Sequence, residues 1–575
     1  MLAKINKLRP AHVALIIAIV GLSVFIIGLK NPFLGDDVSQ IVNNVPVHSL
    51  RNVKLFFDGG TFYNGQGIAP LTGVYYRPLM TVVFATIFTF FNTHVLAYHL
   101  IQLILYIACA FIFYLFLRFS FKTLLALPLA LIFLVHPLNS QVVYEIASTQ
   151  DALFFLFGIL ALWLLLRFKS QKSLVLVVIS LFLCLLSKET AVLFIAMALL
   201  YLFWFNRKRL LAFVLTMIVP FAFYLVLKVH AIGLFTNPRN SPIDGYSLAG
   251  RLMTAPSIAY LYLSKVLVPW RLASGYYFTY PYFSVRHVLI PLIVDLTVIG
   301  LFVYLGFVIR KRVSRGRLYT YIFFGIWSLI GLLALMQIVP LDMTACATWF
   351  YFSLAGILGM IGVLLTAFQK YFSPSTFLAV ALLVILVFGV MSAERGPNWK
   401  SEYILARYDL HASSTDFNAY NSIADTYINE QNFKEALPYA QDAVNIYPTA
   451  LTYLNLGTSL AGIGEYPQAL TAYQSGIKIF KYNVIYENMG ALTLFYGTPA
   501  ANQKFLVSAV DKFSGDSVLW MYLAILEDRY YSNAGAKICI TYAAKFGQVP
   551  SFIYNGIMND KPFTIYIAGK TINVK

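Results

Sequence analysis

The sequence AHVALIIAIVGLSVFIIGLKNPFLGDD, residues 11–37, decides the fold. It carries no charge from His12 to Leu29, a run of about the length that an α-helix needs to cross a bilayer. A cleaved signal peptide has a shorter apolar core and a small-residue cleavage motif, and neither is present here. We therefore predict a first transmembrane helix that starts in the cytoplasm after a basic N-terminus. It delivers Asp36 and Asp37 to the other side of the membrane.

The composition of the whole chain is that of an integral membrane protein. Of its 575 residues, 59% are hydrophobic and only 11% are charged, whereas about a quarter of the residues in a soluble protein are charged. The net charge of +18 is concentrated in short clusters between apolar runs. Such clusters are typical of cytoplasmic loops and not of a contiguous nucleic-acid-binding face. We therefore expect membrane lipid and no nucleic acid as partners. The clusters lie at residues 4–9, 118–122, 167–172, 207–209 and 310–317.

Thirteen apolar segments are candidates for helices. If all five basic clusters are cytoplasmic, two segments are not complete crossings, one between Arg77 and Arg118 and one between His230 and Arg310. We therefore predict about eleven crossings, with thirteen as the alternative. Both odd counts place the N-terminus in the cytoplasm, and they place the loop 30–77 and the C-terminal part outside it. The segments are 11–29, 78–91, 95–117, 123–135, 152–166, 173–186, 190–205, 210–228, 252–268, 288–309, 318–337, 349–367 and 374–392.

The chain after Met391 has a soluble composition, and it repeats. Aromatic and small residues recur in steps of 33 to 34 residues, which is the length of a tetratricopeptide (TPR) repeat. Four degenerate repeats over about 417–550 predict a short α-solenoid with a concave face. The fold class is therefore all-α, with a transmembrane module at 1–395, TPR repeats at 396–550 and a C-terminal tail at 551–575. The recurring positions include Tyr420, Ala424, Ala436 and Ala443, then Tyr453, Gly457, Ala469 and Gly476, then Tyr486 and Gly490, and finally Trp520, Ala524 and Ala536.

Polar residues gather at the predicted extracytoplasmic ends of the apolar segments. Desolvation at the membrane boundary raises the pKa of a carboxylate, so Asp36 or Asp37 is a candidate general base. A solvated turn or a helix cap is the alternative for this pair. Arg77 can bind a phosphate or anchor the next helix at the interface. Polar groups at membrane depth are costly unless they are used, and this adds further candidates on the same side: His136, Gln141, Glu145, Asp151, Lys188 and Glu189.

The alternative for these further candidates is a purely structural role. Lys188 and Glu189 can simply pair with each other, and the others can belong to a satisfied boundary loop. No metal site is predicted, since histidines are few and one acidic pair offers a hard cation too few oxygen ligands. The cysteines lie far apart and form no disulfide framework. They are Cys109, Cys184, Cys346 and Cys539.

Together these residues resemble the GT-C membrane glycosyltransferases. The closest similarity is to protein O-mannosyltransferase-like proteins, which combine a multi-helix membrane module with C-terminal TPR repeats. The sequence departs from the family pattern at Gln141, where relatives often have Glu, and at Thr149, where they often have Arg. Residues 345–351 also lack the acidic and arginine residues expected before the aromatic run. The resemblance rests on Asp36-Asp37, residues 76–79, 136–151, 187–189 and 340–351, and the repeats.

The resemblance implies an inverting transfer of a hexose from a polyprenyl-phosphate donor on the extracytoplasmic side, with no cofactor. Asp36, with Asp37 as the alternative, would deprotonate an acceptor hydroxyl, and the lipid phosphate would leave. Arg77, Lys188 and His136 are the implied donor-phosphate groups. The other implied substrate-site residues are Gln141, Glu145, Asp151, Glu189, Tyr76, Trp349 and Tyr351.

Several functions remain open at this stage. The leading hypothesis is transfer to protein Ser or Thr, with the TPR surface binding the polypeptide acceptor. The same fold could instead glycosylate a cell-envelope lipid or glycan. An oligosaccharide ligase with a TPR tail would not predict the acidic pair after the first helix. A non-catalytic TPR membrane scaffold or transporter is the alternative of another class, although the sequence shows no half-to-half repeat of the transporter kind.

Overall fold

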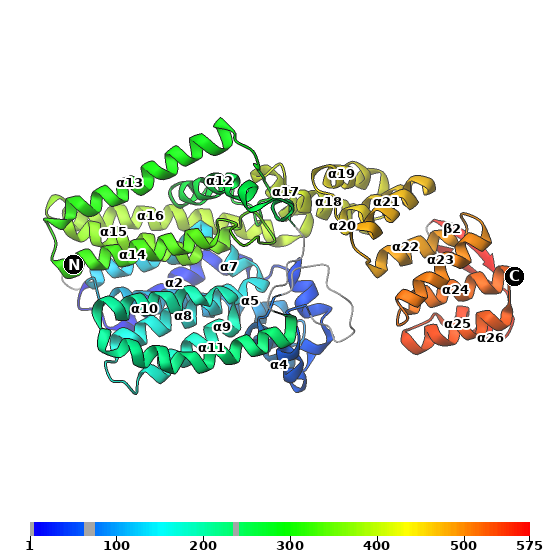
Figure 1. Cartoon of the computed structure of the whole chain (residues 1–575), viewed down its shortest axis with the longest axis horizontal. Coiled ribbons are helices and arrows are strands. Elements are labelled where there is room, and N and C mark those ends of the chain that lie inside the picture. The colour runs from blue at the N-terminus through cyan, green and yellow to red at the C-terminus, as the bar shows by residue number, and fades with distance from the viewer. Residues whose placement is uncertain (1–4, 63–74, 234–240, 568, 575) are drawn as a thin grey trace. The chain divides into compact units, whose positions relative to one another are not determined.

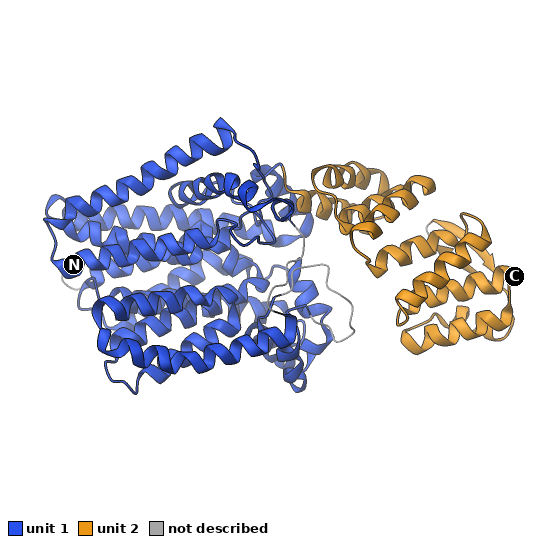
Figure 2. Ribbon diagram, viewed as in Figure 1, with its two compact units in different colours: residues 1–414 blue, residues 415–575 orange. Residues whose placement is uncertain are grey.

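The computed structural model describes residues 5–62, 75–233, 241–567 and 569–574 (Figure 1). Its described residues are predominantly helical, which confirms the predicted all-α fold. The chain divides into two compact units, residues 1–414 and 415–575 (Figure 2). The division lies beyond the predicted domain boundary at residue 395, because helix α17, Glu402–Ala412, belongs to the first unit.

All thirteen predicted apolar segments form helices. Each is an almost uninterrupted run of apolar residues, and in a bilayer such a run is stable as a helix because the backbone hydrogen bonds are then satisfied within the segment. The helices are α2 Pro10–Phe25, α4 Pro78–Phe91, α5 Val95–Leu117, α6 Thr123–Val135, α8 Thr149–Arg167, α9 Leu174–Ser187, α10 Val192–Phe205, α11 Leu210–Ile232, α12 Leu248–Leu267, α13 Ile290–Arg310, α14 Arg315–Ala334, α15 Tyr351–Ala367 and α16 Pro374–Arg395.

Eight helical stretches in the described part of the chain are long and apolar enough to cross a membrane, and the bent pair Thr123–Val135 and Pro137–Tyr144 makes a ninth. This count is below the predicted eleven because α9 and α10 are only 14 residues long. At 1.5 Å per residue each spans about 21 Å, less than the ~30 Å of a hydrocarbon core. Both pack within the bundle against α8. The eight are Pro10–Gly28, Val95–Leu117, Ile146–Arg167, Arg207–Ile232, Val285–Arg310, Arg315–Ala334, Ala347–Ala367 and Pro374–Lys400.

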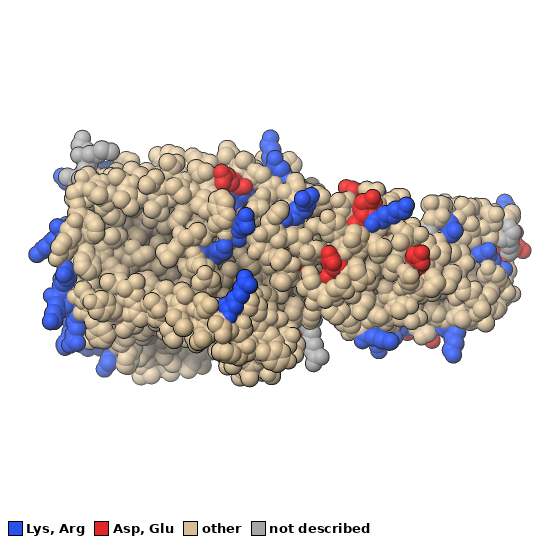
Figure 3. Space-filling view, turned by 90° about the horizontal axis from the view of Figure 1, so that it is seen from above, with Lys and Arg blue, Asp and Glu red and all other residues tan. Residues whose placement is uncertain are grey.

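The basic clusters lie together at one end of this bundle. The guanidinium of Arg209, between α10 and α11, donates to the carbonyl of Phe168, between α8 and α9, at 2.9 Å. Arg312, between α13 and α14, donates to the Tyr371 hydroxyl, between α15 and α16, at 2.9 Å. Lys and Arg side chains gather at the left end of Figure 3. The connections that carry the predicted site residues lie at the opposite end of the helices.

Helices α4 and α12 remain at the end opposite the basic clusters. The ring of Phe88, near the end of α4, stacks on His48 of the loop after α2, with centroids 3.9 Å apart. From α12, Arg251 Nε donates to the carbonyl of Gln337 at 2.8 Å, and the Tyr262 hydroxyl donates to that of Cys346 at 3.0 Å. Both acceptors lie between α14 and α15. These are the two intervals in which the charge pattern predicts an incomplete crossing.

The described residues of the second unit form four helix pairs, a further helix and a small sheet. The first helices of successive pairs begin at 33- or 34-residue steps, as the repeat pattern predicts. Small residues allow the paired helices to approach closely: a Cβ on Gly457 would lie 2.4 Å from the Tyr473 ring. The pairs are α18 Phe417–Asn429 with α19 Phe433–Ile446, α20 Ala450–Gly462 with α21 Tyr466–Ile479, α22 Asn483–Thr493 with α23 Pro499–Lys512, and α24 Ser517–Tyr530 with α25 Asn533–Phe546.

The C-terminal tail is folded, which the sequence did not predict. Helix α26, Ser551–Met558, is followed by the antiparallel strands β1, Phe563–Ile567, and β2, Lys570–Val574. Ile565 and Ile572 face each other across the pair and are buried in the apolar cluster of the last repeats. The tail therefore covers an apolar end of the solenoid that would otherwise be exposed.

The bundle core contains a close approach of α8 and α10 at Gly158. A Cβ at this position would lie 2.1 Å from the ring of Phe194, whereas a Cβ at Gly300, on α13, would meet nothing within 4 Å. We predict that Gly158→Leu destabilises the protein by about 1–3 kcal/mol, the usual cost of overpacking. Thermal unfolding in detergent measures this, and Gly300→Leu is the control with an unchanged midpoint. Equal midpoints for the two variants would contradict the described packing.

Candidate active site

Asp36 and Asp37 have different roles in the turn after α2. Asp37 is 2% exposed. Its Oδ1 accepts a hydrogen bond from the Ala147 amide at 2.6 Å, and its Oδ2 accepts from the Leu34 amide at 3.3 Å. Asp36 is exposed. Asp37 therefore fixes the turn and ties it to the segment before α8, while the carboxylate of Asp36 is accessible.

The surroundings of Asp36 favour its protonated form. Protein atoms around the accessible carboxylate displace water and raise its pKa to about 6. The carboxylate of Asp342 acts in the same direction, the guanidinium of Arg77 opposes it, and Glu402 adds a smaller rise. A carboxylate with a pKa close to neutral is suited to accept a proton and to release it again. Asp36 is therefore the member of the acidic pair that is the better candidate for a general base.

A second group of polar residues follows the bend between α6 and α7, Gln141–Tyr144. The chain bends by 52° between Thr123–Val135 and Pro137–Tyr144, where Pro137 cannot continue the hydrogen bonding of α6. Gln141 Nε2 donates to Glu145 at 3.2 Å and to the carbonyl of Ser274 at 3.3 Å. Ser148 Oγ also donates to Glu145. The negative charge of Asp36 acts on Glu145, so this carboxylate lies beside the candidate base.

Arg77 and Glu189 form an ion pair at the start of α4. Arg77 Nε lies 3.5 Å from Glu189 Oε2, and the guanidinium lies over the Tyr75 ring, 3.9 Å from its centroid. Glu189 also accepts a hydrogen bond from the Tyr76 amide at 2.9 Å. Arg77 is therefore held by an acid and a ring, and its charge acts on Asp36. A guanidinium in this position can pair with an anionic oxygen.

Lys188 pairs with Asp151 and not with its neighbour Glu189. Lys188 Nζ lies 2.6 Å from Asp151 Oδ1, and the two side chains are 10% and 5% exposed. The positive charge of Lys188 is therefore already compensated by a buried partner. This pairing gives Lys188 a structural role, in addition to any contact with a substrate phosphate.

The remaining predicted residues lie in the walls of the site or in the core. His136 accepts from the Leu138 amide at 3.3 Å, and its other ring nitrogen lies 3.1 Å from the Val266 carbonyl, so both nitrogens contact the backbone. Tyr76 is fully buried, and Tyr351 packs among aromatic rings with 1% of its surface exposed. Trp349 is half-buried. These four side chains support the site by packing.

Sequence reasoning did not single out Asp342 and Glu402, whose charges act on Asp36. Asp342 lies inside the quoted segment 340–351, before the aromatic run, so its signal was available. Glu402 lies beyond the last membrane helix, in a polar stretch without a motif. Its position becomes visible only in the fold.

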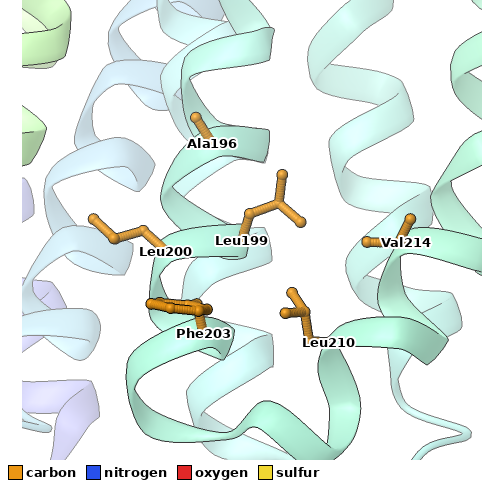
Figure 4. Close-up of a pocket in the computed structure, with 6 residues that line it drawn as sticks. All are labelled: Ala196, Leu199, Leu200, Phe203, Leu210 and Val214. Atoms are coloured by element: carbon orange, nitrogen blue, oxygen red, sulfur yellow. The ribbon is translucent and has the colours of Figure 1, made fainter.

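An apolar recess between α10 and α11 is separate from this polar site (Figure 4). It lies close to the basic connection Arg207–Arg209, which joins these two helices. Its side chains carry no group that could take part in a transfer reaction. They are Ala196, Leu199, Leu200, Phe203, Leu210 and Val214.

The fold and the site define a polytopic all-α membrane protein with an acidic site at the end of its bundle opposite the basic clusters. Its residues 76–232 match the family model of dolichyl-phosphate-mannose-protein mannosyltransferases. The chain is also 27% identical over 103 residues to the Protein O-mannosyl-transferase Tmtc3 of Drosophila melanogaster. That match covers 18% of this chain and 11% of the relative, so the chain spans a small part of the relative's length.

This chain is therefore an integral, multi-pass membrane protein that is similar to protein mannosyltransferases. The resemblance stated from the sequence is confirmed. The matched residues 76–232 contain Arg77, Glu145 and the pair of Lys188 with Asp151. Asp36 lies before them.

The buried pair of Lys188 and Asp151 predicts a specific pattern of stability. Lys188→Met leaves the Asp151 carboxylate buried without its partner and should cost about 3–5 kcal/mol, whereas replacing both members with apolar residues is often neutral. In thermal unfolding in detergent, we expect Lys188→Met to lower the midpoint temperature. The double variant Lys188→Met/Asp151→Leu should restore most of that decrease. Lys172→Met, at an exposed lysine, is the control. A double variant no more stable than the single one would contradict the structural role of the pair.

Proposed function

We propose that the protein is a membrane glycosyltransferase that moves a sugar from a polyprenyl-phosphate donor to an acceptor hydroxyl, with Asp36 as the general base. The observation that carries the proposal is the difference between the two acids of the pair. Both carboxylate oxygens of Asp37 accept hydrogen bonds that hold the turn, whereas Asp36 is accessible and interacts electrostatically with Arg77. The similarity of residues 76–232 to mannosyltransferases supports the same class of reaction.

In the proposed reaction, Asp36 accepts the proton of the acceptor hydroxyl as its oxygen attacks the anomeric carbon of the sugar. The bond between that carbon and the phosphate oxygen breaks, its electron pair stays with the lipid phosphate, and the configuration at the carbon inverts. Arg77 would compensate the charge that develops on the leaving phosphate. The proton on Asp36 then passes to water, which restores the base.

The donor and the acceptor are proposed at the level of chemical class. The names of the similar proteins favour a mannosyl group on a polyprenyl phosphate and a protein hydroxyl as the acceptor. The helix pairs of the second unit would bind the polypeptide, and a cell-envelope lipid or glycan is the alternative acceptor. Basic connections favour the cytoplasmic side, so the site at the opposite end and the second unit would be extracytoplasmic.

The proposal predicts that Asp36→Asn lowers sugar transfer by about 10²-fold or more, the scale of losing a general base. The assay is transfer of radiolabelled mannose from polyprenyl-phosphate mannose to protein in reconstituted membranes. Asp58→Asn is the control, because Asp58 is an exposed acid of the same loop. Full activity of Asp36→Asn would exclude this base. Absence of transfer by the wild type from several donors would instead favour a non-catalytic scaffold.

The pH dependence of transfer is a separate prediction. A general base acts only when it is deprotonated, so kcat/KM should fall about tenfold per pH unit below the pKa of Asp36, which is about 6. Asp342→Asn removes a negative charge that raises this pKa, and the acidic limb should therefore move to lower pH. Profiles of kcat/KM between pH 4 and pH 8 measure the acidic limb of the wild type and that of Asp342→Asn. A limb that is unchanged in Asp342→Asn would show that another group titrates.

A further inference from the structure

The helix that follows the last membrane span is hydrogen-bonded to the turn that carries Asp36. Helix α17, Glu402–Ala412, begins with an acid whose Oε1 accepts from the Gly35 amide. The helix does not need this carboxylate as a cap, because Ser401 already accepts from the Ile404 amide at 3.2 Å. Gly35 has a φ of +51°, and it immediately precedes the candidate base. The Glu402 side chain therefore fixes the backbone at the residue before Asp36.

A second acid on the same face of α17 is hydrogen-bonded to Ser274, in the segment that follows α12. Asp409 lies seven residues after Glu402, a spacing that places both side chains on one face of a helix. Its Oδ1 accepts from the Ser274 amide at 3.0 Å, and its Oδ2 accepts from the Ser274 hydroxyl. The carbonyl of Ser274 in turn accepts from Gln141 Nε2 at 3.3 Å and from Cys346 Sγ at 3.1 Å. Asp409 is thus linked to Gln141 through Ser274.

The chain just before α17 contacts the same two segments, the loop of Asp36 and the segment of Ser274. The Asn31 side-chain amide, in the loop of Asp36, donates to the Gly396 carbonyl at 3.0 Å. Arg395 donates to the Leu272 carbonyl, and its guanidinium lies 5.6 Å from the centroid of the Tyr408 ring on α17. The stretch from Arg395 to Asp409 therefore bridges the Asp36 turn and the Ser274 segment at four separate points.

We propose that α17 is a positioning element of the site, in which Glu402 aims the Asp36 turn and Asp409 holds the Ser274 segment. The effect of this positioning on sugar transfer rests on the proposed function, whereas the fixing of the turn does not. Hydrogen bonds from amides to carboxylates are about twice as strong as those between neutral groups. A glycine in the turn has many accessible conformations, and the bond from Gly35 to Glu402 selects one of them. Neither acid touches the reacting groups.

The test uses substitutions of Glu402 in the full-length protein with two readouts. Glu402→Ala removes the acceptor of the Gly35 amide, whereas Glu402→Gln keeps a side-chain oxygen that can accept it. Glu394→Ala is the matched control, at an exposed glutamate of α16. Hydrogen–deuterium exchange of peptides that cover residues 31–41 reports the turn, and the transfer assay reports the reaction.

We expect Glu402→Ala to exchange the Gly35 amide about tenfold faster or more and to lose about 10²-fold in kcat, the scale of a misplaced catalytic group. The acceptor KM should remain unchanged. Glu402→Gln should keep both the slow exchange and most of the rate. Its acidic limb should move to lower pH, because one of the charges facing Asp36 is removed while Asp37, Arg77, Glu145 and Asp342 remain.

Two results would overturn the proposal. One is unchanged exchange at Gly35 in Glu402→Ala, and the other is faster exchange with unchanged kcat. If the alanine variant does not fold, Glu402→Asp replaces it, because its shorter side chain withdraws the carboxylate from Gly35. If the wild type transfers no sugar, the proposed function fails, and exchange at Gly35 alone then decides whether Glu402 fixes the turn.

Discussion

The two hydrogen bonds that Asp37 accepts determine where the rest of the site lies. The bond from the Ala147 amide joins the turn after the first helix to the segment that precedes α8, and the bond from the Leu34 amide closes the turn itself. That segment also carries Glu145, so one buried carboxylate sets the distance between the candidate base and the second polar group. A buried carboxylate is tolerated only when its oxygens are hydrogen-bonded, and Asp37 meets this condition with backbone amides. Asp36 is thereby left accessible.

Four charged residues at the helix ends of the site form two ion pairs. Arg77 is paired with Glu189, and Lys188 with Asp151. Each pair joins residues far apart in the sequence, from α4 to the start of α10 and from α8 to the end of α9. The pairs therefore fix the relative positions of the helix ends as well as their charges. An unpaired charge within a bilayer is costly, and pairing therefore lowers the cost of placing these charges at the ends of apolar helices.

The sequence predicts the fold well because its main signals are local. Apolar runs and basic clusters are read directly, and they indicate thirteen helices, with α4 and α12 in the intervals of incomplete crossing. Asp36 was a candidate for the same reason, since it directly follows the first helix. Partners are harder to predict. Lys188 stands beside Glu189 in the sequence, yet its partner is Asp151, because the end of α9 and the start of α8 are brought together only by the bundle. The β-hairpin of the tail was missed because its strands contain only five residues each.

The charges around Asp36 also restrict how a donor would bind in the proposed reaction. The charges of Asp342 and Glu402 disfavour the ionised form of Asp36, and the charges of Asp36 and Glu145 act on each other. Negative charges of this kind also repel a phosphate. Arg77 is the cation whose charge acts on Asp36. An anionic donor would therefore be favoured near Arg77, whereas the acids would not repel an uncharged acceptor hydroxyl. In the proposed reaction, the acids around the base would therefore disfavour a phosphate beside Asp36 and leave that position to the uncharged acceptor.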